Sequence, residues 1–475
     1  MKNIGDFATF LHDEVNLNKT RLESLENKAG AVQDFISQHW EVKVEQFEKQ
    51  GSWSHGTIIK PPGTKGFDAD LLVFVEPHES WDAAEYIESL YRTFKESGVY
   101  GEKASRQTRC VTIEYANDFT LDVVPCVLRL GGLLGQDICN RKKNEFEATD
   151  GRGFADWWHR QCSFAAGSSM KEAVRLLKYM RDIKGNFSVK SVLLTTLIGQ
   201  QVSFIDQSRN TLSDTPTALK VVMDRLDDYL QSQVTMPEIS NPQLPKEILT
   251  RNWDEQQYQN FRKKMNTYRK WIDEAYDEKD AQLSVNKWRD VFGEDFGAAV
   301  VKEQARSVSS RYMGAIAARI TGNPLISGRI LSLDLLSAIP ANLTWIKKLR
   351  LKTDRTLTVI VRGTLHSARQ GPPIERLESG RVVKKSQEVL FDAVNPMGAP
   401  FSESEFKIRW RIVNTDPDGL RSASELRGGL YKSDPHGKRW ETAQYRGVHW
   451  VEAFLIRKRD NVCCGQSDRF FVAVE

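Results

Sequence analysis

The feature that most constrains the fold is the run from Phe67 to Val75, FDADLLVFV, in which two aspartates precede a continuous apolar stretch. Branched and aromatic residues in such a run are typical of a β-strand. Residues two apart in a strand point to the same face, so Asp68 and Asp70 present both carboxylates together at its start. On spacing alone, such a pair is usually a surface or turn feature. Within an apolar run, unpaired charges would cost roughly several kcal/mol, which favours ions or donors beside them.

A second β-rich run, FTLDVVPCVL, contains Asp122, which we expect at the beginning of another strand. Three carboxylates that converge from neighbouring strands can hold two Mg²⁺ ions about 3.5 to 4 Å apart. Such ions clamp the attacking and leaving oxygens in phosphoryl or nucleotidyl transfer. Asp68, Asp70 and Asp122 therefore predict a two-metal site, and Mn²⁺ is an expected substitute for Mg²⁺.

The segment GSWSHGT, from Gly51 to Thr57, supplies a complementary phosphate-binding element. Gly51 has no Cβ, so a turn there exposes backbone N–H groups, and the hydroxyl of Ser52 is a further donor to triphosphate oxygens. We interpret His55, in the same segment, as a polar loop residue and not as a ligand.

Composition excludes several other classes of protein. The 475 residues would make about three domains of roughly 150 residues, and 40% hydrophobic residues are enough for a folded core. The net charge of +4 is too small for a chain that mainly coats nucleic acid. The charge is uneven, because the region 345–475 holds 24 Lys and Arg against 16 Asp and Glu. A basic C-terminal module therefore follows a mildly acidic body.

Cysteine usage and hydropathy indicate the compartment. The six cysteines lack CxxC spacing and do not form the framework of a secreted domain, which favours a reducing environment. The opening MKNIGDFATFLHDEV has acids and no apolar core, and no apolar run approaches the ~18 residues needed to span a bilayer. We expect a cytoplasmic protein without a membrane partner. Two adjacent thiols, Cys463 and Cys464, are interpreted as inert packing and not as a redox element.

The spacing of apolar residues along the chain predicts regions of different secondary structure. Helical spacing predicts one or two amphipathic helices over 7–49, and short β-rich runs with one helix predict a mixed segment over 51–129. Helical patterns return over 170–296, interrupted by a loop at NPQLP. Alternating runs separated by turn residues then predict a β-sandwich. The expected division is 1–165 for the first helices and α/β core, 166–305 for a helical lobe, 306–344 for a linker and 345–475 for the β domain.

The order GS, DAD before LLVFV, and LDVVP resembles the nucleotidyltransferases of the DNA polymerase beta superfamily, most closely the oligoadenylate synthase and cyclic GMP-AMP synthase branch. Within that branch, residues 7–296 resemble the bacterial CD-NTases of the SMODS type, the cyclic-oligonucleotide synthases of CBASS antiphage defence. The segments FKIRWRIVNTD, LRGGLY and SDRFFVAVE resemble the adenylyl/guanylyl and SMODS C-terminal (AGS-C) sensor domain. The implied fold class is α+β, with a polymerase-beta-like core, a helical lobe and a C-terminal antiparallel β-sandwich.

The resemblance also implies roles for single residues. Asp68 and Asp70 would ligate both metals, and Asp122 would bind the catalytic metal and help to deprotonate the attacking ribose hydroxyl. The pair Gly51 and Ser52 would hold the donor triphosphate. Positions that commonly contact phosphates match Lys178 and Ser191, whereas an alternative register puts Asn186 and Lys190 there.

The leading hypothesis is an Mg²⁺-dependent enzyme that joins nucleoside triphosphates into a cyclic di- or trinucleotide and releases pyrophosphate. Its product would reach a separate effector protein, and nucleic acid would not be required. One alternative is a template-independent nucleotidyltransferase that acts on RNA or protein. Another is a scaffold without catalysis, which the presence of all three acids disfavours.

The basic C-terminal module contains aromatic residues whose role has two interpretations. They are the lining of a base-stacking pocket or, as is more usual for alternating aromatics on strands, the filling of a sandwich core. The candidates are Trp410, Tyr431, Trp440, Tyr445, His449 and Trp450. The resemblance implies a regulatory domain with an unidentified ligand.

Overall fold

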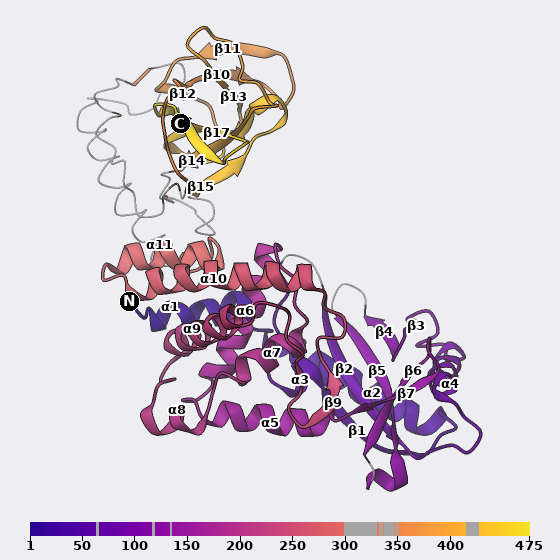
Figure 1. The fold of residues 1–475 in the computed structure, drawn as a ribbon. Helices are drawn as coiled ribbons and strands as arrows, with labels where there is room; N and C mark the ends of the chain where they lie inside the picture. The colour runs from indigo at the N-terminus through magenta and orange to yellow at the C-terminus, as the bar shows by residue number, and fades with distance from the viewer. Residues whose placement is uncertain are drawn as a thin grey trace. The chain divides into compact units, whose positions relative to one another are not determined.

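The computed structural model describes residues 1–62, 66–115, 119–133, 135–298, 330–331, 336, 346, 349, 351–414 and 427–475. These residues separate into two compact units, Met1–Gly293 and Glu294–Glu475 (Figure 1). Most of the predicted linker, 306–344, lies outside the described residues. No helix among the described residues has the length and apolar composition needed to cross a membrane.

The first unit is built around a seven-stranded sheet with the order β1-β2-β5-β4-β3, to which β6 and β7 are added through β5. Its only parallel pair among the described strands is β2 with β5. The strands are β1 (Val44–Gln50), β2 (Phe67–Val75), β3 (Ala104–Arg106), β4 (Val111–Tyr115), β5 (Phe119–Leu128), β6 (Gln136–Asn140) and β7 (Glu145–Thr149).

Helices cover this sheet and form a lobe beside it, as Figure 1 shows for the magenta and salmon segments. The helices of the N-terminal region and sheet are α1 (Ile4–Phe10), a π-helical turn (Leu11–Val15), α2 (Lys19–His39), α3 (Gly51–Ser54) and α4 (Ala83–Lys95). Those that follow the sheet are α5 (Gly151–Ser163), α6 (Ser169–Lys184), α7 (Ser191–Gly199), α8 (Phe204–Arg209), α9 (Thr215–Ser232), α10 (Glu255–Asp277) and α11 (Ala281–Phe292).

The predicted helical region 7–49 is wrong at its C-terminal end. Helix α2 ends at His39, and β1 then pairs antiparallel with β2, so that Gln50 lies opposite Asp70. Glu, Gln and Lys in β1 favour a helix by intrinsic propensity. The strand forms because the backbone groups at the edge of β2 need partners, and sheet pairing overrides that propensity.

The predicted loop at NPQLP is a small antiparallel hairpin formed by β8 (Ser240–Asn241) and β9 (Leu244–Ile248). The Asn241 side chain closes it: its Oδ1 accepts a bond from the Gln243 N–H at 2.9 Å, and its Nδ2 donates to Glu247 Oε2 at 2.8 Å. Glu247 also accepts a bond from Thr149 Oγ1 at 3.3 Å. The hairpin is thereby tied to the end of β7.

The second unit is a sandwich of a four-stranded sheet, β11-β10-β13-β16, and a six-stranded sheet, β12-β19-β17-β14-β15, with β18 on β17. All pairs of described strands are antiparallel except β12 with β19. The strands are β10 (Ile360–His366), β11 (Pro373–Leu377), β12 (Arg381–Val383), β13 (Glu388–Val394), β14 (Phe406–Val413), β15 (Arg427–Lys432), β16 (Arg439–Thr442), β17 (Gly447–Arg457), β18 (Val462–Gln466) and β19 (Phe470–Val474).

The core of the sandwich confirms the alternating pattern in the sequence. Side chains from both sheets meet in one apolar cluster, which includes Phe391 of β13, Trp410 of β14 and Val472 of β19. Trp410 is fully buried and donates its indole N–H to the Gly437 carbonyl at 3.1 Å, so it belongs to the core. Both Cys463 and Cys464 are buried and free, as expected for packing residues.

Candidate active site

Strands β2 and β5 bring the predicted acids together. Their parallel register sets Asp68 opposite Thr120 and Asp70 opposite Asp122. Adjacent strands lie about 4.8 Å apart, so the Asp70 and Asp122 side chains stand next to one another on the sheet. Asp122 lies within β5 and does not begin it. Three residues of β5 precede Asp122, and they pair with Phe67, Asp68 and Ala69 of β2.

Two threonines orient the flanking acids. Thr120 Oγ1 donates a hydrogen bond to Asp68 Oδ1 at 2.7 Å. The register pairs Thr112 of β4 with Asp122, and the Thr112 hydroxyl donates to Asp122 Oδ1 at 2.5 Å. Sequence reasoning missed both threonines, since only the strand register shows which residues stand beside the acids.

The acids lie in an environment that disfavours negative charge. The pKa of Asp70 is raised to about 7. Burial is the main cause, and the nearby Asp122 and Asp68 carboxylates contribute to the same increase. Burial also raises the pKa of Asp122, against the hydrogen bond from Thr112. Within the described part of the chain, no Lys or Arg forms an ion pair with any of the three acids. An arrangement of this kind favours a cation at the site.

The donor chemistry fits divalent cations, since Mg²⁺ binds oxygen ligands and is often held by one or two carboxylates together with substrate phosphates. In the described residues, however, no group of three or more His, Cys, Asp or Glu side chains is already arranged as a metal-binding cluster. The bonds from Thr112 and Thr120 hold two of the acids in their present orientations. Each of these bonds occupies only Oδ1, so Oδ2 of Asp68 and Asp122 stays available to an ion, with phosphate oxygens completing the ligand set.

Gly51 touches the acids directly. It begins α3 immediately after β1 and has φ +60°, in the left-handed region that favours glycine. A Cβ at this position would lie 2.6 Å from Asp70 Oδ2, which is closer than side-chain atoms approach. Only glycine therefore fits at this position without displacing the Asp70 carboxylate. Ser52 follows it and lines the same cavity.

Lys178 lies deep in this cavity. It is 3% exposed, and its Nζ donates to the Thr57 carbonyl at 3.1 Å and to Thr57 Oγ1 at 2.9 Å. Burial lowers the pKa of Lys178 to about 7, with Arg181 the next contribution. Thr57 is fully buried and was not singled out from the sequence, although it ends the GSWSHGT segment.

The start of α7 forms the opposite side of the cavity. Ser191 is the first residue of that helix, and its hydroxyl accepts a bond from Arg181 Nη1 at 3.2 Å. Both Ser191 and the preceding Lys190 line the cavity. Asn186, from the alternative register, does not line it, because its Oδ1 accepts a bond from the Tyr268 hydroxyl at 2.9 Å.

The whole cavity has a volume of about 940 Å³. It brings together all seven residues selected from the sequence: Gly51, Ser52, Asp68, Asp70, Asp122, Lys178 and Ser191. Three carboxylates and the basic side chains of Lys178, Arg181 and Lys190 line the same cavity. Such a site can bind a polyphosphate between cations and the basic side chains.

His55 differs from its expected role as a polar loop residue. It is buried, and its ring packs against Phe154 with centroids 5.0 Å apart. Burial lowers its pKa to about 3, followed by the positive charge of Lys178. The Trp158 indole donates to the His55 carbonyl at 3.0 Å, which anchors this loop to α5. His55 is therefore a neutral packing residue at the edge of the cavity.

The mixed sheet, the acids on adjacent strands β2 and β5 and the glycine-serine turn beside them define a nucleotidyltransferase core of the polymerase beta type. Comparison with known families agrees with this class. Residues 1–161 match the Second Messenger Oligonucleotide or Dinucleotide Synthetase (SMODS) domain, and residues 343–475 match the Adenylyl/Guanylyl and SMODS C-terminal sensor domain. The chain therefore joins a region that matches the SMODS domain to a C-terminal region that matches the AGS-C domain.

Individual relatives are distant in sequence. A protein of Roseivirga ehrenbergii named c-di-GMP synthase is 24% identical over 282 residues, which cover 53% of this chain and 73% of the relative. A structure of Escherichia coli MS115-1 CdnC with ATP is 20% identical, has a TM-score of 0.50, and is matched over 62% of this chain and 98% of its own. The structure of Bradyrhizobium diazoefficiens CD-NTase CdnG in complex with GTP is 18% identical, with a TM-score of 0.50, over 61% of this chain and 94% of its own. These structures share the fold of the first unit.

Proposed function

We propose that this protein is a metal-dependent nucleotidyltransferase that joins nucleoside triphosphates into a cyclic di- or trinucleotide and releases pyrophosphate. The observation that carries the proposal is the convergence of Asp68, Asp70 and Asp122 on one cavity with Gly51 and Lys178. The distant relative named c-di-GMP synthase supports cyclic-dinucleotide chemistry.

The three acids act on the reacting oxygens. Two bound Mg²⁺ ions would supply charge stabilisation for the acceptor hydroxyl, the α-phosphate and the leaving pyrophosphate. Asp68 and Asp70, at the start of β2, would hold both ions, and Asp122 would hold the one nearer the acceptor. Asp122 would also help to take the acceptor hydroxyl proton, since burial raises the pKa of its carboxyl.

Basic and backbone groups position the donor nucleotide. The N–H groups of the turn at Gly51 and the Ser52 hydroxyl would hold the donor triphosphate, since Gly51 lies beside Asp70 and Ser52 lines the same cavity. Lys178 is the positive group at the base of the cavity, and a phosphate would replace Thr57 as its partner. Holding the donor α-phosphate in line with the acceptor hydroxyl supplies a large part of the rate in reactions of this kind.

The sensor-domain match supports a regulatory role for residues 343–475. The setting that we propose is bacterial CBASS defence, in which the product activates a separate effector protein. A cytoplasmic location agrees with the six free cysteines among the described residues. We retain the boundaries 1–165, 166–305, 306–344 and 345–475 as the proposed functional division of the chain.

The test is to incubate the purified full chain with all four NTPs and Mg²⁺ or Mn²⁺, treat the mixture with phosphatase, and analyse it by mass spectrometry. Phosphatase-resistant cyclic species that disappear in Asp70→Asn support the proposal. Products that form only when RNA or another protein is added would replace it with a template-independent transferase. Metal-dependent NTP binding without turnover under any condition, with or without the acceptors, would leave a scaffold.

A further inference from the structure

The second unit contains a cavity of about 360 Å³ between its two sheets. Its floor consists of apolar side chains from both sheets, among them Phe391 of the four-stranded sheet and Ile412 and Val472 of the six-stranded sheet. Protein interiors seldom leave voids larger than a water molecule. A space of this size that reaches the core of a sandwich is within the range of small-molecule sites, about 300 to 1,000 Å³.

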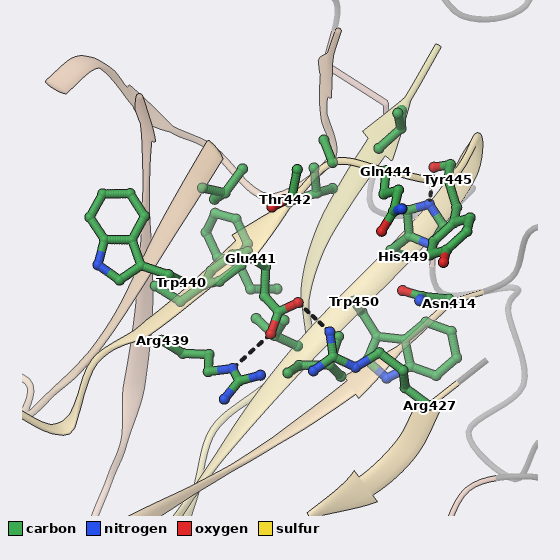
Figure 2. A pocket seen from close by; sticks show the side chains of 18 of the residues that line it. Asn414, Arg427, Arg439, Trp440, Glu441, Thr442, Gln444, Tyr445, His449 and Trp450 are labelled. Atoms are coloured by element: carbon green, nitrogen blue, oxygen red, sulfur yellow. Dashed lines mark hydrogen bonds and ion pairs between the residues drawn. The ribbon is translucent and has the colours of Figure 1, made fainter. Parts of the chain in front are cut away.

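Charged side chains form one edge of this cavity (Figure 2). Glu441 accepts hydrogen bonds from two arginines: Arg439 Nε donates to its Oε1 at 2.7 Å, and Arg427 Nη1 donates to its Oε2. The three residues carry one positive charge in excess. The Arg427 guanidinium also lies 4.5 Å from the centre of the Tyr431 ring. Both guanidinium groups are therefore held in place before any ligand arrives, which lowers the entropy cost of binding an anion.

Polar and aromatic side chains form the other edge. Figure 2 shows Gln444, Tyr445 and His449 grouped on the side of the cavity away from Arg439. The His449 ring Nε2 lies 2.7 Å from the Tyr445 carbonyl, so the two residues form one wall. Trp440 is different: it alternates with Arg439 and Glu441 along β16, and its ring contacts His366 at 4.7 Å. Trp450 likewise alternates with His449 and Val451 along β17, and its ring contacts Phe471 and the Arg469 guanidinium. Of the aromatic residues selected from the sequence, Tyr445 and His449 therefore remain as the candidates for ring contacts.

We propose that this cavity is a binding site for a single nucleotide unit, with the phosphate at Arg427 and Arg439 and the base inserted between the sheets. Paired arginines are suited to phosphate because the guanidinium fork matches its oxygens. A flat ring suits a slot bounded by two sheets that pack about 10 Å apart. The volume favours one nucleotide over a whole cyclic dinucleotide.

Two sources supply this chemistry, a free mononucleotide and one nucleotide of a cyclic product. The site is independent of the proposed synthase activity, because every residue used here belongs to the unit Glu294–Glu475. Failure of either proposal would leave the other intact.

The test is isothermal titration calorimetry on the full chain with AMP, GMP, CMP and UMP in EDTA, which removes metal-dependent binding at the acids. Ribose 5-phosphate and cyclic di-GMP are titrated in parallel. At least one monophosphate should bind at least tenfold more tightly than ribose 5-phosphate, because the base adds stacking and apolar contacts. A cyclic dinucleotide that binds more tightly than every monophosphate would identify the product as the source. Equal binding of ribose 5-phosphate would overturn the placement of the base.

Variants locate the binding. Arg439→Gln should weaken it at least tenfold, and Arg376→Gln, an exposed arginine on β11, should leave it unchanged. Arg427→Gln is a second test, read together with thermal unfolding because Arg427 also packs on Tyr431. Photo-crosslinking with 8-azido-AMP in EDTA should label a peptide that contains Tyr445 and His449. Absence of monophosphate and cyclic di-GMP binding, unchanged binding in both folded pocket variants, or labelling confined to residues 51–57 would overturn the site.

Discussion

The active-site cavity of the first unit and the inter-sheet cavity of the second unit differ in how their charges are balanced. In the first unit, Asp68, Asp70 and Asp122 lie together without an ion-pair partner among the described residues, and the pKa of Asp70 rises to about 7. In the second unit, Arg427 and Arg439 share Glu441, so one of the two positive charges is balanced within the cluster. Uncompensated like charges indicate a site for counter-ions and chemistry. A paired cluster with one positive charge in excess is instead suited to reversible binding of an anion.

The largest expected effect is that of Asp70→Asn. The substitution removes a carboxylate from the proposed metal site, and we expect synthesis to fall by about a thousandfold or more. Thermal unfolding without metal should show no loss of stability, because the variant also removes a half-buried charge that Asp122 and Asp68 repel. Synthesis within tenfold of the wild type would remove Asp70 from the reaction. A large decrease in melting temperature would show that the Asp70 carboxylate has a stabilising partner in the metal-free protein, which would contradict the description of these acids as uncompensated.

Gly51→Ala should reduce activity by about a hundredfold, since small displacements of reacting groups have effects of this size. The added Cβ would meet Asp70 Oδ2 at 2.6 Å. Gly167→Ala is the matched control, because Gly167 has φ +55°, open space around its missing Cβ and no place in the lining of the cavity. Both variants should lose about 1 to 2 kcal/mol of unfolding free energy from the left-handed backbone. Steady-state synthesis and chemical denaturation measure the two effects, and equal activities would refute the contact with Asp70.

Lys178→Met should lower synthesis by about tenfold to a hundredfold, because a hydrogen bond to a charged group is lost from the donor phosphates. Thr57→Val keeps the lysine but removes one of its two bonds in the free protein. We expect Thr57→Val to have less than a tenth of the effect of Lys178→Met on kcat/KM. If the two variants are equally impaired, the lysine serves the loop and not the nucleotide.

Loss of Glu441, which pairs with Arg427 and Arg439 in the second unit, should lower the free energy of unfolding. Glu441→Ala leaves two mostly buried arginines without their shared acceptor, at a cost of about 1 to 3 kcal/mol of unfolding free energy. Glu375→Ala breaks the more exposed pair with Arg381 and should cost about 1 kcal/mol or less. Denaturant titrations of the two variants provide the measurement. Equal losses would mean that Glu441 is no more structural than a surface acid.

The last effect concerns the pH dependence of stability. The folded-state pKa of His55, about 3, is below its usual value of 6.5, so the stability from keeping it neutral is complete above pH 6.5 and is lost progressively as pH falls toward 3. Each unit of pH in that window removes up to about 1.4 kcal/mol. Thermal unfolding of His55→Gln should therefore depend less steeply on pH between 6.5 and 5 than that of the wild type. Parallel curves would assign the acid sensitivity to other groups.

The sequence predicts those parts of the site that depend on local features, namely the alternation of side chains along a strand and a glycine in a turn. Asp68 and Asp70 share a face because strand residues alternate, and the glycine of the GS turn is required by its backbone angle. The partners of these residues depend on pairings between distant segments. Thr112 stands beside Asp122 only because β4 pairs with β5, and Thr57 meets Lys178 across 121 residues. No local pattern encodes either contact.

The same distinction explains the fold. The alternating strands of the sandwich were predicted well, since each has one face in the core. Strand β1 was assigned to a helix, because its polar sequence lacks strand character and forms only against the edge of β2. The hairpin β8–β9 was taken for a loop, because the side-chain bonds of Asn241 that close it leave no periodic signal.

The parallel pairing of β2 with β5 also bears on how the protein acquires its activity during folding. Thr120 and Asp68 are 52 residues apart, and β3, β4 and α4 lie between the two strands. A large loop must close before the carboxylates meet, and contacts of that range form late and slowly compared with local ones. A newly made chain would therefore form its turn at Gly51 and most of its helices before the three carboxylates could meet.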